Sequence, residues 1–204
     1  MIRKIFEIID NFVTWQTIGW ATKYYKIKAG DTILDIGGYF GGFAIYASKK
    51  VGKSGKVFCF EPDPRNWEIL ERKIKNGKIN NIILIKKAVS NKRGKVTLTS
   101  NFSFSSIVQQ SQKNGVLVEA ITLDDELSNL NINKINLVKM NIEGAEIEAI
   151  EGARKALTIV KNIVIASHNR NNKDTADMLK TEIERLGFKT NISCYLHKNL
   201  YGSK

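Results

Sequence analysis

The fold is decided by one stretch, Thr32-Ile-Leu-Asp-Ile-Gly37-Gly-Tyr-Phe-Gly-Gly42. Its first five residues are β-branched or apolar around Asp35, which is typical of a buried parallel strand. The glycines that follow allow a tight turn and a close backbone approach to a ligand, before a helix that we predict over residues 40–51. The dinucleotide fingerprint G-x-G-x-x-G would need glycine at position 39, where Tyr39 stands. The pattern is instead D-x-G-x-x-x-G.

The carboxylates near this turn indicate the kind of ligand. Asp35 would repel a pyrophosphate, so we expect a ligand that is cationic or neutral at this point, as S-adenosylmethionine is. Glu61 ends a second predicted strand over residues 56–60, where it can accept hydrogen bonds from both ribose hydroxyls of an adenosine. Pro62 stiffens the loop after it, because proline locks its own φ. A purely structural glycine turn is the alternative.

The rest of the chain alternates strands and helices, which predicts an α/β, doubly wound, mostly parallel sheet with helices on both faces. Ligands bind such sheets beyond the carboxyl ends of the strands. Further strands are predicted over 82–85, 136–142 and 162–166, and further helices over 64–77, 146–157 and 174–186. Extra strands are predicted over 94–100 and 116–120 around a polar loop at 101–115, and two weak strands over 188–200.

The first 28 residues stand apart from this domain, which we place at residues 29–204. Apolar residues at 2, 5, 9 and 12 predict an amphipathic helix that packs on the domain or caps its site. Membrane anchoring is the less favoured alternative, because Glu7 and Asp10 offset Arg3 and Lys4. No uncharged apolar run is long enough for a transmembrane segment or a secretory leader, so we expect a cytoplasmic protein.

The chain is strongly basic. Its 204 residues contain 32 Lys+Arg and 20 Asp+Glu, a formal net charge of +12. Nine of the basic residues lie within 72–95, where no acid occurs, which would suit a phosphate-binding patch for nucleic acid. A solvated lysine-rich face is favoured instead, because no aromatic side chain is interleaved through this segment to stack on bases.

A second motif lies in Leu137-Val-Lys-Met-Asn-Ile-Glu-Gly-Ala-Glu146. Strand alternation places Lys139, Asn141 and Glu143 on one face if the strand stays extended to 143. Together with the glycine turn, Phe60-Glu-Pro62 and Thr122-Leu-Asp-Asp125, this run resembles the FkbM family of S-adenosylmethionine-dependent methyltransferases. The resemblance extends from about Thr32 to Gly187.

The resemblance implies a class I (Rossmann-like) methyltransferase fold and O-methylation of hydroxyl groups on sugars, lipids or other small molecules. It implies cofactor contacts at the methionine end, the ribose and the adenine, and a pair of residues facing the transferable methyl. The resemblance places Asp35, Gly37, Gly38 and Gly41 at the methionine end, and Glu61, Pro62 and Asp63 at the ribose. It places Ala88 and Val89 at the adenine, and Asn141 and Glu143 facing the transferable methyl.

Two positions depart from the family pattern. Gly38-Tyr39 replaces the usual Ala-Asn, and Asn141 replaces an Asp. An amide cannot act as a carboxylate base, so a cofactor-binding protein with weakened catalysis stays open as an alternative.

The residues also suggest how a hydroxyl acceptor would be activated. Glu143 and His168, which follows the predicted strand over 162–166, are the candidate bases. Lys139 is a further catalytic candidate, or it pairs with Glu143 or another acid. Ser105 and Ser106 either line the acceptor pocket or belong to a plain loop, and His197 is expected to be structural or exposed. No residue cluster has a metal-ligand spacing, although Asn141 and Glu143 could offer oxygen ligands to a hard cation.

Three functions therefore follow from the sequence. The first is a methyltransferase acting on a hydroxyl of a small molecule, sugar or lipid-linked glycan. The second is an RNA or DNA methyltransferase using the basic 72–95 segment, although the N-P-P-Y/F signature of amine-methylating nucleic-acid enzymes is absent. The third is a cofactor-binding protein that has lost catalysis.

Overall fold

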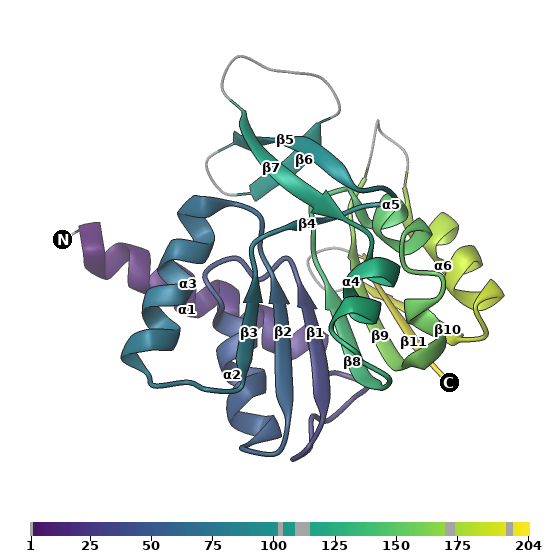
Figure 1. Ribbon diagram of the computed structural model, residues 1–204, viewed down its shortest axis with the longest axis horizontal. Helices are drawn as coiled ribbons and strands as arrows, with labels where there is room; N and C mark the ends of the chain where they lie inside the picture. The colour runs from purple at the N-terminus through teal and green to yellow at the C-terminus, as the bar shows by residue number, and fades with distance from the viewer. Residues whose placement is uncertain (1, 102–103, 109–114, 170–173, 195–197) are drawn as a thin grey trace.

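The computed structural model describes residues 2–101, 104–108, 115–169, 174–194 and 198–204 (Figure 1). Its main feature is a seven-stranded sheet with the order β10-β11-β9-β8-β1-β2-β3. The strands are β1 (Thr32–Ile36), β2 (Lys56–Phe60), β3 (Ile82–Ile85), β8 (Ile135–Met140), β9 (Val160–Ser167), β10 (Lys189–Cys194) and β11 (Lys198–Ser203). All neighbouring pairs are parallel except those that involve β11.

The order reverses beside β1, which positions the site. From β1 the chain moves outward to β2 and β3 on one side, and it later returns to place β8 on the other side. Loops leaving β1 and β8 therefore diverge at their carboxyl ends and leave a crevice there, as is usual at a topological switch point.

Helices cover both faces of the sheet, as the sequence predicts. One face packs against α4 (Leu123–Asn129), α5 (Glu146–Glu151) and α6 (Ala176–Arg185), and the other packs against α1 (Ile2–Ala21), α2 (Gly42–Val51) and α3 (Pro64–Asn76). Alternation along the strands supplies both cores. In β1, for example, Leu34 and Ile36 point into the first core and Ile33 into the second.

A second, smaller sheet lies beyond the carboxyl end of the main sheet, at the top of Figure 1. It has the order β4-β7-β5-β6, formed by β4 (Ala88–Val89), β5 (Gly94–Asn101), β6 (Phe104–Val108) and β7 (Val116–Ile121). The expected loop over 101–115 is therefore wrong in part, because residues 104–108 pair with β5 as an antiparallel strand. Ser105 and Ser106 lie on this strand; their side chains are outside the described part of the chain.

Several predicted boundaries also differ. The helix expected from residue 40 begins at Gly42, because Tyr39 (φ 52°) and Gly41 (φ 81°) adopt left-handed conformations that a helix cannot include. The helix expected over 146–157 ends at Glu151 and is followed by a 3₁₀ turn, Ala156–Ile159. Within the described residues, no helix has the length and apolar character needed to cross a bilayer.

Candidate functional site

A pocket opens at the switch point, over the carboxyl ends of β1, β2 and β8. About 920 Å³ of unfilled space, part of it open to solvent, lies among these strand ends, β4 and the inner side of α1. Nine residues predicted from sequence line it: Gly37, Gly38, Glu61, Pro62, Ala88, Val89, Lys139, Asn141 and Glu143.

The glycine turn is tied to both neighbouring strands. The amides of Gly37 and Gly38 donate to the carbonyl of Phe60 at 2.9 and 3.0 Å. A Cβ on Gly37, whose φ is 81°, would lie 1.9 Å from the carbonyl oxygen of Asn141, and one on Gly38 would lie 2.2 Å from Cys59 Sγ. The glycines are therefore needed for close packing of the backbone, which places the turn at the pocket wall.

Asp35 lies beneath this turn, not at the pocket wall. It is fully buried, and Lys139 Nζ donates to its carboxylate at 2.8 Å and to the carbonyl of Gly37 at 2.7 Å. Burial raises the pKa of Asp35, and the adjacent ammonium of Lys139 opposes that rise. Asp35 therefore contacts the pocket lining only through Lys139. The acid that pairs with Lys139 is Asp35 and not Glu143.

Glu61 presents a preorganised carboxylate at the tip of β2. It accepts hydrogen bonds from the amides of Tyr39 (2.8 Å) and Asp63 (3.0 Å) and from Asn66 Nδ2 (3.2 Å). Burial raises its pKa to about 7, because desolvation outweighs these bonds. Oε1 accepts the bonds from Asp63 and Asn66, and Oε2 accepts only the bond from Tyr39, so Oε2 still has acceptor capacity for a further donor.

Two other predicted cofactor residues do not reach the pocket. Asp63 caps α3 by accepting from the amide of Arg65 at 2.9 Å, and its carboxylate also binds the Arg65 side chain. Gly41 faces Leu70, whose Cδ1 would lie 2.1 Å from an added Cβ. Both residues shape the loops that carry the pocket wall.

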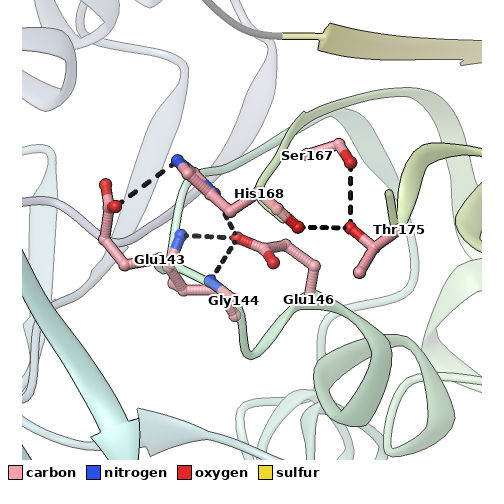
Figure 2. A network of polar contacts seen from close by, with 7 residues as sticks. Glu143, Gly144, Glu146, Ser167, His168 and Thr175 are labelled. Atoms are coloured by element: carbon pink, nitrogen blue, oxygen red, sulfur yellow. Dashed lines mark hydrogen bonds and ion pairs between the residues drawn. The ribbon is translucent and has the colours of Figure 1, made fainter. Parts of the chain in front are cut away.

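Figure 2 shows a network of polar contacts that connects Glu143 with His168, Glu146 and Thr175. Glu143, on the pocket wall, lies with Oε2 3.4 Å from His168 Nε2, and His168 Nδ1 lies 2.9 Å from Glu146 Oε1. Glu146 is buried and accepts from the amide of Gly144 at 3.1 Å. Thr175 donates to the carbonyl of His168 at 2.6 Å, which fixes the backbone there. The imidazole is therefore held between two carboxylates.

The electrostatics of this network favour sharing of a proton between Glu143 and His168. Burial raises the pKa of Glu143, and the nearby imidazole of His168 partly offsets that effect. Burial alone would lower the pKa of His168, but the hydrogen bond to Glu146 and the charges of both glutamates raise it above the ordinary value. His168 does not line the pocket, so any contact with a ligand there passes through Glu143.

The second motif reaches the pocket although its strand is shorter than expected. β8 ends at Met140, and Glu143 has a φ of 54°, so the segment turns instead of continuing as a strand. Lys139, Asn141 and Glu143 nevertheless all line the pocket. Asn141 Oδ1 is buried and has no hydrogen-bond partner among the described residues, so a pocket-lining residue keeps an unused acceptor.

Sequence reasoning missed the residues that α1 brings to the pocket. Asp10, Val13, Thr14 and Thr17 share one side of this helix and line the pocket. Their helical spacing was the available signal. Asp10 is also held by Lys73 Nζ at 2.6 Å.

The basic 72–95 segment is less uniform than the sequence suggests. Lys87 lines the pocket between Glu119 and Glu126, at 3.5 and 3.3 Å, so the segment is not confined to a surface away from the site. Lys86 binds Glu71 at 2.8 Å. Ion pairs to acids elsewhere in the chain thus neutralise part of the charge that the sequence assigned to this face.

Two further sequence predictions concern a metal ion and the second histidine. In the part of the chain that the structure describes, no group of three or more His, Cys, Asp or Glu side chains could hold a metal ion. His197 lies outside the described residues.

The sheet order, the glycine turn at the switch point and the acid at the tip of β2 define a class I methyltransferase fold. The chain belongs to the FkbM methyltransferase family, because the model of the methyltransferase FkbM domain matches residues 35–190.

Sequence relatives are distant methyltransferases. The hexuronic acid methyltransferase AglP of Haloferax volcanii is 25% identical over 168 residues, which cover 79% of this chain and 68% of AglP. The 2-O-methyltransferase NoeI of Sinorhizobium fredii is 26% identical over 150 residues, covering 64% of this chain and 60% of NoeI.

Solved structures agree on the fold. An FkbM methyltransferase from Methylobacillus flagellatus superposes with a TM-score of 0.67 at 18% identity. The match covers 92% of this chain but only 47% of that protein. Fibrillarin from Aeropyrum pernix, crystallised with S-adenosyl-L-methionine, gives a TM-score of 0.61 at 14% identity over 92% of this chain and 72% of fibrillarin.

Proposed function

We propose that this protein is an S-adenosylmethionine-dependent O-methyltransferase whose acceptor is a hydroxyl group of a sugar or another small molecule. The observation that carries the proposal is Glu143, a carboxylate on the pocket wall that is backed by His168 and Glu146. A carboxylate base is suited to a hydroxyl acceptor, which must lose a proton as it is methylated. The name of AglP, a hexuronic acid methyltransferase, supports a sugar as the acceptor, and the name of NoeI, a 2-O-methyltransferase, supports transfer to oxygen.

The pocket residues fit the proposed cofactor. Glu61 offers a carboxylate to the ribose hydroxyls, and the unpartnered Asn141 Oδ1 offers an acceptor to an ammonium or amide donor. Ala88 and Val89 add an apolar wall suited to an adenine. Bound there, S-adenosylmethionine would supply a methyl group on a positively charged sulfur.

Glu143 is assigned the role of base. Held by Glu61 and Asn141, the cofactor would supply the methyl group to the acceptor oxygen and keep the electron pair of the carbon–sulfur bond, which leaves only the hydroxyl proton for this chain's residues to accept. The hydroxyl proton passes to the Glu143 carboxylate and can be shared with His168 Nε2. Glu146 binds Nδ1, which leaves the lone pair of neutral His168 at Nε2, facing Glu143. Positioning of the two reactants supplies much of the remaining rate.

The test follows a tritiated methyl group from S-adenosylmethionine into cell extract, which is then separated into nucleic-acid, protein, lipid and small-molecule fractions. We expect label in the small-molecule or the lipid-linked sugar fraction, and none with Glu143→Gln, which should still bind S-adenosylhomocysteine. The matched control is Glu151→Gln, an exposed glutamate of α5, which should label as the wild type does. Label in the nucleic-acid fraction, or undiminished labelling by Glu143→Gln, would contradict the proposal.

A further inference from the structure

The outward side of α1 is unusually apolar for a surface helix. Eight large hydrophobic side chains are exposed among the described residues, and four of them lie on this one helix. They are Ile8 (67% exposed), Ile9 (55%), Phe12 (56%) and Trp15 (65%). Apolar groups concentrated in this way mark a contact surface more often than single exposed residues do.

Three of these residues, Ile8, Phe12 and Trp15, face away from the pocket, whereas helical spacing places Ile9 between the two sides of the helix. At about 3.6 residues per turn, Ile8, Phe12, Trp15 and Gly19 fall on one side of the helix, roughly 180° from the pocket-lining side around Val13 and Thr17. A Cβ on Gly19 would meet nothing within 4 Å, so this side is open along its length. The rings of Phe12 and Trp15 lie 6.5 Å apart and present one aromatic surface. We call Ile8, Phe12, Trp15 and Gly19 the outer face of α1.

We propose that the outer face of α1 docks on the surface of an anionic lipid membrane, with the helix axis lying in the plane of that surface. The outer face carries no charged side chain and contains two aromatic residues, Phe12 and Trp15. Such a helix buries its apolar side at the boundary between headgroups and acyl chains. Tryptophan is particularly suited to that boundary, because its ring is amphipathic.

Charge on and around the helix favours anionic lipid. Lys23, Lys26 and Lys28 follow α1 directly and are exposed. The two acids of α1 lie off the outer face: Asp10 faces the pocket and is paired with Lys73, and helical spacing places Glu7 roughly 110° around the helix from the centre of the outer face. Basic residues beside an inserted helix add to its attraction for negatively charged headgroups.

The same charge argues against a second copy of the chain as the occupant. Each copy carries a formal net charge of +12, so bringing two copies together through this surface would incur like-charge repulsion. An anionic membrane gains from that charge. The proposal does not depend on the methyl-transfer chemistry, since it rests on the outer face and not on the pocket.

Vesicle flotation tests the proposal with the full chain. Vesicles of phosphatidylserine and phosphatidylcholine in equal parts should carry the protein, whereas vesicles of phosphatidylcholine alone should not. Phe12→Ser combined with Trp15→Ser should lower binding at least tenfold. The matched control, Leu117→Ser combined with Met178→Ser, removes exposed apolar side chains elsewhere and should bind as the wild type does. Circular dichroism of each variant checks that the fold is retained.

Two further measurements sharpen the result. Lys26→Glu combined with Lys28→Glu should also lower binding to the anionic vesicles at least tenfold, because both the number and the sign of nearby charges change. Trp15 fluorescence should shift to shorter wavelength on binding, as its exposed ring enters an apolar environment.

Three outcomes would overturn the proposal. The protein could fail to float with either vesicle, or the Phe12→Ser/Trp15→Ser variant could float as well as the wild type. Sedimentation equilibrium could instead reveal a dimer that this variant dissociates, with no vesicle binding, which would assign the outer face to a second copy of the chain.

Discussion

Glu61 links the proposed ligand to pH in a way that can be measured directly. Glu61 is 5% exposed, and burial raises the pKa of its carboxyl group from 4.5 to about 7 against the hydrogen bonds that it accepts. A ribose diol donates hydrogen bonds, so it should bind the ionised carboxylate much better than the protonated one. We therefore predict that affinity for S-adenosylhomocysteine rises with pH across neutrality.

The size of the effect follows from the pKa. With a pKa of about 7, the ionised fraction of Glu61 grows from roughly one tenth at pH 6 to roughly nine tenths at pH 8, so the association constant should rise about tenfold. Isothermal titration calorimetry measures this rise. Below pH 7 it should also detect a proton released on binding, as a dependence of the heat on the buffer.

Glu61→Gln is the matched variant, because it keeps the shape of the side chain and removes its titration. It should bind S-adenosylhomocysteine at least tenfold more weakly at pH 8, and the pH dependence due to this residue should disappear. An affinity of the wild type that does not change from pH 6 to pH 8, or an equal slope in Glu61→Gln, would refute the reasoning.

The raised pKa also predicts a cost in stability. Because the folded-state pKa lies above the unfolded value, protonated Glu61 favours the folded state fully below pH 4.5, and that contribution is lost as the pH rises through about 7. The shift corresponds to about 3 kcal/mol in the free energy of unfolding. Urea unfolding at pH 4 and pH 8 should show this loss in the wild type relative to Glu61→Gln, and parallel pH profiles of the two proteins would contradict it.

The remaining predictions concern the support of the pocket. Glu146→Gln should lower the pKa of His168, because it removes the negative charge bonded to Nδ1. NMR titration of the two histidines of the chain measures this shift, and an unchanged titration of His168 would count against the contact. Lys139→Met should lower the free energy of unfolding by about 3–5 kcal/mol, because it leaves a buried carboxylate unpaired, and Asp35→Asn in the same chain should restore part of that loss in urea unfolding. Gly38→Ala should destabilise the fold by about 1–3 kcal/mol in the same assay, since its Cβ would lie 2.2 Å from a buried cysteine sulfur, whereas wild-type stability would contradict the packing of the turn.

Much of the fold could be predicted because its signals are local. The strand over residues 32–36 and the glycines after it form a pattern readable within about ten residues, and so does the run from Lys139 to Glu146. Parallel strands then bring their carboxyl ends to one edge, which is why residues 37, 61 and 141 meet although they are far apart in sequence.

The rest of the site depends on contacts that no local pattern contains. Lys139 pairs with Asp35 across 104 positions, so the sequence could not show that this acid is covered. The inner side of α1 showed a helical period, but nothing in it indicated which surface it would cover. Glu146 stood in the second motif as a bare acid, and its role became visible only when the end of β9 brought His168 beside it.

The central claim is methyl transfer to a hydroxyl group with Glu143 as the base, and one measurement tests it most directly. The small-molecule fraction that accepts label in the first experiment is prepared again from untreated extract. The protein is incubated with this fraction and with S-adenosylmethionine that carries a ¹³C methyl group, and the product is observed by carbon NMR. The account predicts a methyl ether resonance that is absent with Glu143→Gln and present with Glu151→Gln. A resonance of an N-methyl or C-methyl group, or an equal methyl ether signal with Glu143→Gln, would contradict it.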